Sequence, residues 1–396
     1  MQNLNEMLTE ENYVNQTHQI NQTLASLIQT KHFNAQPTSW EDVQKIVRAG
    51  RASRVFSIGD QLTCQRGNNT LVWDVIGIDH DTPSDPKFTH SLTLQLHDCF
   101  PTTLQFDAPE AFYYCHSVLT AGTYYFSDGS TERQFTTLAD IDAGRQLILN
   151  FTGNTPTSIF VSAAVGGDFV KDTNGENNLT IAVTAGSGGT ALDNNYINDI
   201  NRVRYGSNNY KESAIRQWLN KSNVAGSVWT AQNNFDRPPS WGSNTVGFMY
   251  GMDADFLAVI GKTRIVTARN AATDGGGENG LTKSDETDDY FFLLSRSEVY
   301  GGDEVTQTVD NVKTAVVDEG APYPYYGKEY SDLGNSAGTG KDSNRIKYRN
   351  GSAQHWWIRT PNLGNGSIVR DVITSGAVSA TGPNGGYGVA PACNII

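Results

Sequence analysis

The sequence predicts an α+β fold, because helical and strand-like patterns follow one another irregularly along its 396 residues. Apolar residues recur at helical spacing in a few stretches, while short alternating or apolar runs fill most of the remainder. No regular succession of strand, helix and parallel strand occurs, so a doubly wound α/β sheet is not expected. The length of the chain also predicts two or three structural units.

The N-terminal region predicts a helix over residues 9–31, in which Ile20, Leu24, Leu27 and Ile28 fall on one face. This apolar stripe is narrow and lies among Asn, Gln and Thr residues. The helix is therefore expected to pack against another surface. A neighbouring subunit and the rest of its own chain are both suitable partners.

Three further helices are indicated. Ser39 and Asp42 have the spacing of a capping box, and Ser295 and Glu298 repeat it in the S-x-x-E form. A third helix is expected at residues 211–220, where apolar side chains share one face. These helices are short, so strands and loops are expected to carry most of the fold.

Several strands are expected before and after the middle of the chain. Each is a short apolar or alternating run bounded by Gly, Asn, Asp or Pro. They are Arg54–Cys64, Thr70–Asp79, Phe88–His97, Ile260–Arg269, Phe291–Leu294, Gln354–Arg359, Ile368–Thr374, Ala377–Ala380 and Val389–Cys393. The terminal run Val389–Ile395 is expected to pair beside the strand that contains Trp356 and Trp357.

The middle of the chain predicts a separate all-β module at residues 119–189, inserted into a discontinuous domain of residues 39–118 and 190–396. Residues 1–38 are expected to form an N-terminal helical attachment or oligomerisation segment. Within the module, five short strands separated by Gly and Asp turns are expected. They are Thr123–Phe126, Gln134–Leu138, Arg145–Phe151, Ser158–Val165 and Leu179–Val183.

The charge pattern argues against a nucleic-acid partner. The formal net charge is −13, and the basic residues form no stripe. Phosphate contacts need clustered Lys and Arg, which scattered surface charge does not supply. Only 18% of residues are charged, while Gly, Asn, Ser and Thr are abundant, as in adaptable recognition loops.

The N-terminus has no basic-then-apolar signal peptide, and no stretch approaches the ~18 apolar residues of a membrane span. We therefore expect a protein made in the cytoplasm, without membrane insertion. The four cysteines, Cys64, Cys99, Cys115 and Cys393, form no CxxC pair. We interpret them as small buried apolar residues in preference to disulfides or metal ligands.

The last third of the chain contains a series of short motifs that together resemble one fold family, and matching motifs occur upstream. In the last third they are Phe291–Ser295, Glu298–Gly301, Asn344–Lys347, Trp356–Pro361, Gly376–Val378 and Gly388–Ile395. Upstream they are Val55–Asp60, Val75–His80, Phe106–Ala108 and Ser213–Asn220. The number and order of these motifs resemble C-type-lectin-fold domains of the formylglycine-generating-enzyme type. They are most similar to the versions in phage tail proteins and in variable proteins of diversity-generating retroelements. The resemblance covers about residues 40–116 and 195–396.

This resemblance implies a protein of a phage tail or prophage, located in the virion, that binds a host cell-surface protein or glycan through the C-terminal part of its lectin-like domain. Other tail proteins and a second copy of the chain are further expected partners, and no cofactor is expected. Side chains without an evident core role lie between the fixed motifs and are the candidate ligand-binding residues. They are His355, Trp356, Asn362, Asn365, Ser367, Val369, Arg370, Asp371, Ser379, Thr381, Asn384 and Tyr387. Trp357 is expected to lie in the core instead.

Enzymatic interpretations have weaker support. Formylglycine-generating enzymes use a paired, copper-binding cysteine site, whereas Cys393 stands alone in the terminal region. No nucleophile elbow, P-loop or GxGxxG context is present. A glycan hydrolase with a pair of carboxylates remains the alternative, as does a structural tail or baseplate component without a receptor.

Two segments carry possible metal ligands. Asp79-His80-Asp81, with His90 and His97 downstream, combines imidazole and carboxylate groups. We interpret these residues as strand-end caps and space-filling side chains. The loop 274–280 has oxygen ligands for calcium but lacks EF-hand spacing, so a turn is the preferred interpretation and no metal site is predicted.

Overall fold

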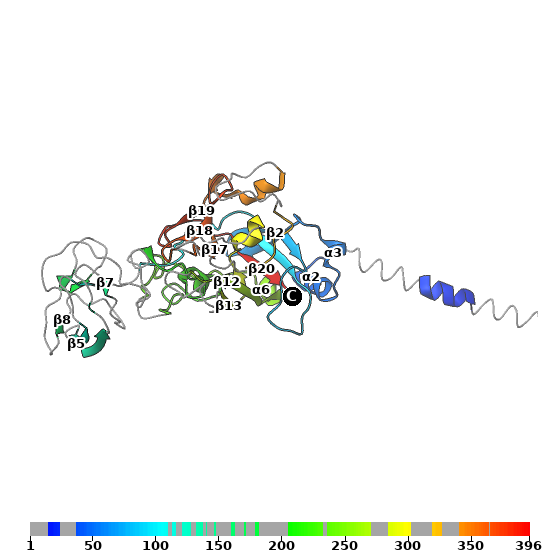
Figure 1. Cartoon of the computed structure of the whole chain (residues 1–396). Helices are drawn as coiled ribbons and strands as arrows, with labels where there is room; N and C mark the ends of the chain where they lie inside the picture. Colours follow the sequence, from blue (N-terminus) through cyan, green and yellow to red (C-terminus); the bar gives the residue numbers. More distant parts are fainter. Residues whose placement is uncertain are drawn as a thin grey trace, which may run out of the picture.

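The structure is a computed structural model of the chain (Figure 1). It describes residues 15–23, 37–109, 205–232, 236–270, 284–301, 319–326, 340–363 and 365–396, with Ala121, Asp140 and short strand segments between residues 113 and 181. Residues 15–23 form a helix whose residues are all exposed. The rest of the stretch predicted to be helical, including Leu24, Leu27 and Ile28, lies outside the described residues.

Helix α2 (Trp40–Arg48) begins where the sequence predicts it. The hydroxyl of Ser39 accepts a hydrogen bond from the Asp42 amide at 3.1 Å, while the Asp42 carboxylate turns back to Thr38. Val43 and Val47 form its buried face. The prediction of a strand from Arg54 was wrong at its start, because a short helix α3 (Ala52–Val55) precedes β1 (Gln61–Arg66).

The main sheet is antiparallel and has the order β1-β2-β3-β20-β11, with β14 also paired to β20. Its other members are β2 (Asn69–Ile78), β3 (Leu92–Leu96), β11 (Ile260–Gly261), β14 (Phe291–Phe292) and β20 (Ala392–Ile395). β20 pairs with β3, β11 and β14, so the expected pairing beside the tryptophan strand was wrong. An isolated parallel bridge, Trp356 with Gly388, joins that strand to the C-terminal segment instead. All four residues of β20 are buried, because the strand lies between partners on both sides.

A second pair, β12 (Thr263–Ala268) with β13 (Ser284–Asp289), contains a strand that the sequence patterns missed. β13 reads Ser-Asp-Glu-Thr-Asp-Asp, yet Asp285, Thr287 and Asp289 are buried in alternation. Its two buried carboxylates are paired with cations, Asp285 with Lys211 and Arg269, and Asp289 with Arg216. Buried charges of this kind are tolerated because they are paired and hydrogen-bonded.

The C-terminal third forms a hairpin and a three-stranded sheet. The hairpin is β15 (Lys347–Arg349) with β16 (Ser352–Gln354), and the sheet has the order β17-β18-β19. Its strands are β17 (Trp356–Pro361), β18 (Val369–Val372) and β19 (Val378–Thr381). The strands predicted at Gln354–Arg359, Ile368–Thr374 and Ala377–Ala380 therefore have counterparts here.

Short helices complete the described body: α5 (Ala214–Leu219), α6 (Ala254–Val259), α7 (Arg296–Tyr300) and the 3₁₀ helix η1 (Gly340–Arg345). The predicted capping box of α7 is present in full, with reciprocal bonds between Ser295 and Glu298. Gly301 ends α7 at φ 75°, a conformation that suits glycine. Mixed helices and antiparallel sheets confirm the α+β class.

In and beside the predicted β module, the described strand segments form two small sheets of order β7-β4-β10-β9 and β6-β5-β8. Figure 1 draws labelled members of both apart from the main sheet. The strands are β4 (Tyr113–Cys115), β5 (Gly122–Ser127), β6 (Glu132–Thr137), β7 (Gln146–Leu147), β8 (Phe160–Ser162), β9 (Val170–Lys171) and β10 (Leu179–Ile181). All five strands predicted for the module overlap one of them.

The core is rich in aromatic rings that meet between the main sheet and the helices. Trp73 packs against Phe248, Phe256 and Phe291, with ring centroids 5.4–6.4 Å apart. Cys64, Cys99 and Cys393 are buried and free, which confirms their predicted role as small core residues. Among the described residues, no helix has the length and apolar character needed to cross a membrane.

Candidate ligand-binding surface

The β17–β19 sheet divides the predicted binding residues between its two faces. Cross-strand register places Asp371 opposite both Trp357 and Ser379, so these three side chains share one face. Because side chains alternate along a strand, His355 and Thr381 fall on that same face, whereas Trp356 and Arg370 fall on the other. The sequence could not decide this division, since it depends on strand register.

His355 is joined to a buried carboxylate. Its Nδ1 lies 2.9 Å from Oδ2 of Asp371, and the two side chains are 35% and 1% exposed. Burial raises the pKa of the Asp371 carboxyl above its ordinary value, and His355 partly opposes that shift. The other carboxylate oxygen, Oδ1, is buried and has no hydrogen-bond partner among the described residues. Asp371 thus fixes the orientation of the imidazole while itself staying out of reach of solvent.

Tyr387 holds the imidazole from its other side. The His355 and Tyr387 rings are stacked, with centroids 5.1 Å apart at 24°, and Tyr387 also packs at 4.9 Å on the buried ring of Trp357. The Tyr387 hydroxyl lies 3.3 Å from the Thr381 hydroxyl. The partly exposed rings of His355 and Tyr387 are therefore held in place by the buried side chains of Asp371 and Trp357.

The loop after β17 is held by a residue that the sequence analysis missed. Asn208 is fully buried, and its side-chain amide donates to the carbonyl oxygens of Asn365 and Ile368 at 2.8 Å and of Asn362 at 3.3 Å. Its own carbonyl accepts a bond from Asn270 at 2.7 Å. Nothing in the local sequence separates this asparagine from its many neighbours of the same type.

A second missed residue, Tyr205, borders the glycine-rich loop 382–388. Its carbonyl accepts the Asn384 amide at 2.9 Å, and its side chain is 41% exposed. A Cβ on Gly382 would lie 3.3 Å from Tyr205, and one on Gly385 would lie 3.4 Å from the Tyr387 ring. Two glycines of this loop, which we call the glycine-rich floor, therefore lie against the two tyrosines. We call His355, Thr381, Asn384, Tyr387 and Tyr205 the rim.

Four of the twelve predicted binding residues are buried and cannot offer a contact surface, which corrects their assignment. They are Trp356, Ser367, Val369 and Asp371. Trp356 is 0% exposed, and its indole nitrogen donates to the carbonyl of Arg345 at 2.9 Å. An apolar ring that fills the core contributes more stability than an exposed one, so Trp356 joins Trp357 inside. The remaining eight are partly exposed.

Of the loop members, Asn365 uses its side-chain oxygen to accept bonds from the amide and hydroxyl of Ser367 at 2.8 and 2.7 Å. These contacts shape the loop from within. Asn362 and Asn365 thus belong to this loop, and Arg370 lies on the opposite face of the sheet from His355, whereas Ser379 shares the face of His355. Four of the eight partly exposed predicted residues lie in the rim.

A buried ion pair anchors the inner part of β17. Both terminal guanidinium nitrogens of Arg359 donate to Glu298, at 2.6 and 2.7 Å, and one also donates to the Glu319 carbonyl at 2.7 Å. The Glu319 carboxylate accepts the Ala268 amide at 3.0 Å and also the Thr360 hydroxyl. Burial raises the pKa of Glu319 to about 7, although Arg359 opposes that shift. This network ties β17 to α7 and β12.

The possible metal ligands near His80 are engaged with one another and with tyrosines. Asp81 accepts bonds from His80 at 2.9 Å and from the Tyr323 hydroxyl at 2.8 Å, and the His80 and Tyr323 rings stack at 3.9 Å. His90 contacts Asp79 at 3.1 Å. Within the described ranges, no group of three or more His, Cys, Asp or Glu side chains is arranged to hold a metal ion. The loop 274–280 lies outside the described residues.

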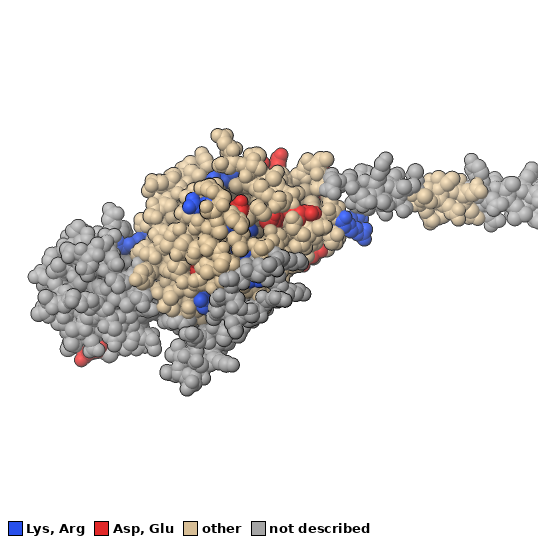
Figure 2. Space-filling view, turned by 90° about the horizontal axis from the view of Figure 1, so that it is seen from above, with Lys and Arg blue, Asp and Glu red and all other residues tan. Residues whose placement is uncertain are grey.

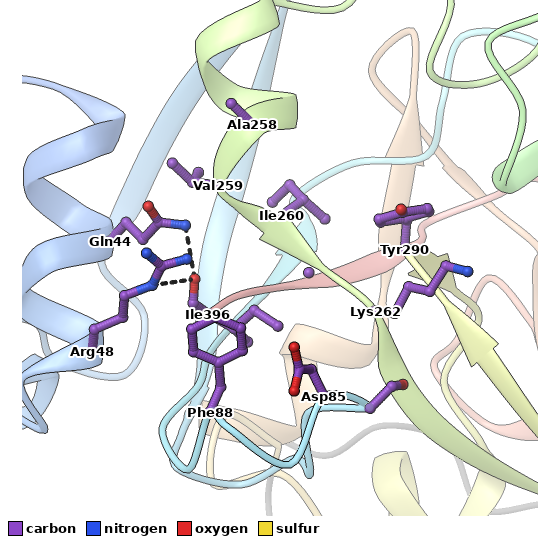
Figure 3. Close-up of a pocket in the computed structure, with 12 residues that line it drawn as sticks. Gln44, Arg48, Asp85, Phe88, Ala258, Val259, Ile260, Lys262, Tyr290 and Ile396 are labelled. Carbon is purple, nitrogen blue, oxygen red and sulfur yellow. Dashed lines mark hydrogen bonds between the residues drawn. The ribbon is translucent and has the colours of Figure 1, made fainter.

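A separate groove of about 440 Å³ lies beside β11, at the edge of the main sheet (Figure 3). Gln44 and Arg48 of α2 both donate to the Ile396 carbonyl, at 2.8 and 3.2 Å, and Arg48 lies over the Phe88 ring. None of the twelve predicted binding residues lines this groove. Its polar contacts fasten α2 to the end of β20, so we regard it as mainly structural.

Charged side chains are sparse on the described surface seen in Figure 2, where isolated basic and acidic groups are separated by uncharged residues. This agrees with the low fraction of charged residues in the sequence, 18%.

The comparisons with known proteins give one result. A family model described as a domain of unknown function (DUF6273) matches residues 187–396, a range that contains every residue of the rim. No curated protein and no solved structure matches the chain.

Proposed function

The chain belongs to the DUF6273 family, a domain of unknown function that matches residues 187–396. From the geometry of the rim we propose that the chain is a receptor-binding protein. In this proposal it is part of a phage tail or prophage and recognises a host cell surface by non-covalent contacts. The residues outside the family match supply attachment, self-association and spacing.

One observation carries the proposal: partly exposed, hydrogen-bonding side chains are mounted on buried residues that fix their positions. His355 and Tyr387 are held in place by Asp371 and Trp357, which are buried. We call the buried residues beneath the rim the frame. The hydrogen bonds of Arg359 and of Asn208 stabilise it. Binding sites are commonly built this way, on loops positioned by a rigid scaffold.

The C-type-lectin-like fold is part of the same proposal. It is supported by the order of the motifs in the sequence and by the α+β architecture, in which the C-terminal strand β20 pairs between β3 and β11 of the main sheet. Long ordered segments between α5 and β11 and the β17–β19 sheet complete the arrangement. Several copies in one particle would add avidity without new contacts.

A binding assay with intact cells tests the proposal. We would label the full chain with a fluorophore and measure its binding to a panel of bacterial strains by flow cytometry. A variant combining Tyr205→Ala, Thr381→Ala and Asn384→Ala should lose at least about tenfold in apparent affinity, which corresponds to ~1.4 kcal/mol. Tyr250→Ala is the matched control, because Tyr250 is an exposed tyrosine (44%) outside the rim.

Equal binding by the triple variant and the control would contradict the rim as the contact surface. A structural tail component would bind no strain in either form. Release of soluble sugars from bound cells by the wild-type chain would instead support the alternative of a glycan hydrolase.

The genome around the coding DNA gives an independent test of diversification. A near-copy of the segment encoding residues 345–394, differing mainly at adenines and lying beside a reverse-transcriptase gene, would establish a diversified binding protein. The variable codons should then include His355, Thr381, Asn384 and Tyr387 and should spare the buried Trp357. Variation concentrated at buried positions would contradict our assignment of the rim.

A further inference from the structure

The rim presents hydrogen-bonding groups, with no Lys, Arg, Asp or Glu side chain of its own, around two fixed rings. Its side chains are an imidazole, two phenols, a hydroxyl and an amide, and the carboxylate nearest to them, Asp371, is buried. Arg370 lies on the opposite face of β18, because it alternates with Asp371 along the strand. Such a set both donates and accepts hydrogen bonds but supplies little net charge. It complements a ligand rich in hydroxyl groups.

From these features we propose that the ligand at the rim is a neutral cell-surface glycan. This inference rests on the proposed function and specifies the class of receptor. A sugar ring packs its C–H face against the His355–Tyr387 ring pair, while its hydroxyl groups bond to the edge of the rim. Aromatic side chains suit this role because they offer a large rigid contact area at low entropic cost.

Asp371 determines which hydrogen bond His355 offers. In neutral imidazole one ring nitrogen carries the proton and the other accepts. The Asp371 carboxylate, 2.9 Å from Nδ1, holds the proton on that nitrogen. In this tautomer of the neutral imidazole, Nε2 is left as an acceptor. A sugar hydroxyl is the donor that fits it.

The glycine-rich floor extends the site beyond one ring. Tyr205 and Tyr387 approach the loop at Gly382 and Gly385, the two ends of a turn in which the Gly385 amide donates to the Gly382 carbonyl at 3.0 Å, so the α-carbons of the two glycines lie within ~7 Å. Gly386, which follows Gly385, is exposed. Side chains on this floor would fill the space between the two tyrosines. We therefore expect a short oligosaccharide that reaches from Tyr387 to Tyr205.

A protein receptor fits the described surface less well. Protein interfaces centre on a desolvated cluster of aromatic, Met or Arg residues with a polar border. The large apolar side chains exposed in the described ranges are Ile20, Tyr205, Val224, Tyr250 and Tyr348. Of these, only Tyr205 belongs to the rim, so the described part of this surface has no large apolar centre.

The deciding experiment compares two treatments of the cells that bind the chain. Mild periodate oxidises the vicinal diols of sugars, whereas protease removes surface proteins. We expect periodate to reduce binding at least about tenfold and protease to leave it within about twofold, because the contacts are made to sugar hydroxyl groups. The purified wild-type chain should also bind one or more members of an immobilised panel of capsular, O-antigen and cell-wall oligosaccharides.

Variants at the rim link that binding to the proposed contacts. His355→Asn keeps a donor for Asp371 but removes the ring and Nε2, and should weaken binding to the oligosaccharide at least about tenfold. Tyr205→Ala should weaken it for longer oligosaccharides more than for monosaccharides. Tyr250→Ala should have no effect, and melting temperatures of all variants check that the fold is retained.

The outcomes separate this inference from the proposed function. Protease could abolish binding while periodate leaves it unchanged and rim variants still weaken it. This result would overturn the inference that the ligand is a glycan, but receptor binding would stand. Glycan binding that is unchanged in both His355→Asn and Tyr205→Ala would overturn the rim as its site. Absence of binding to cells and oligosaccharides alike would overturn both.

Discussion

The two ends of the β17 strand differ in almost every physical respect. His355, just before the strand, is partly exposed and contacts one buried carboxylate, whereas every residue of Trp356–Pro361 is buried. At the inner end Arg359 makes several hydrogen bonds to other segments. In our proposal, this difference lets a recognition surface change while the fold persists, because stability resides in the frame and contact chemistry in the rim.

The largest expected effect is at the buried ion pair. Arg359→Ala removes the partner of Glu298, which is 5% exposed, and leaves a buried charge uncompensated. We expect a loss of about 3–5 kcal/mol in the free energy of unfolding, measured by urea denaturation. The control is Arg264→Ala, which breaks an ion pair between side chains that are 54% and 56% exposed and should change the free energy of unfolding far less, because solvent screens this pair. Similar losses of unfolding free energy in both variants would show that the buried ion pair of the frame contributes no more to stability than an exposed one.

A pH titration tests the same frame through Glu319, whose pKa is raised from 4.5 to about 7 by burial. The folded state therefore binds this proton more tightly than the unfolded state does. Its contribution is fully present below pH 4.5 and is lost as the pH rises through about 7. We expect the free energy of unfolding of the wild type to fall over this window relative to Glu319→Gln, by ~3 kcal/mol at most. Parallel stability curves for the two proteins would show that Glu319 does not titrate there.

Asn208 holds the loop after β17 through uncharged hydrogen bonds, so its replacement should have an intermediate effect. Asn208→Ala removes the donor of the Asn365 carbonyl and one of the two donors of the Asn362 and Ile368 carbonyls, and costs about 1–3 kcal/mol. The loop 362–368 should also become more accessible, which limited proteolysis or hydrogen exchange would report. Unchanged exchange in this loop would mean that other contacts hold it.

The smallest effects on stability are expected at the rim. Tyr205→Ala, Thr381→Ala and Asn384→Ala should each change the free energy of unfolding by about 0.5 kcal/mol or less, because these side chains are at least partly exposed. Thermal denaturation measures this directly. A loss as large as that of Arg359→Ala at any of them would place that residue in the frame. The difference between frame and rim is supported if these substitutions weaken binding and leave the free energy of unfolding nearly unchanged.

The sequence was informative about several elements of the frame. Capping residues predicted α2 and α7, and apolar alternation predicted β2, β3 and most of β17–β19. It failed at β13, whose acidic residues are buried because Arg216, Arg269 and Lys211 come from other segments to pair with them. It also misplaced β20, since an apolar run does not specify its partner strands.

For the candidate site, the sequence by itself located the region and named His355, Thr381, Asn384 and Tyr387, because these polar and aromatic residues stand between apolar motifs. Only the tertiary structure decided that four predicted residues, Trp356, Ser367, Val369 and Asp371, are buried and that Tyr205 joins the rim. The physical reason is that exposure depends on strand register and on contacts between distant parts of the chain, such as the hydrogen bond from the Asn384 amide to the Tyr205 carbonyl. Local spacing carries no information about either.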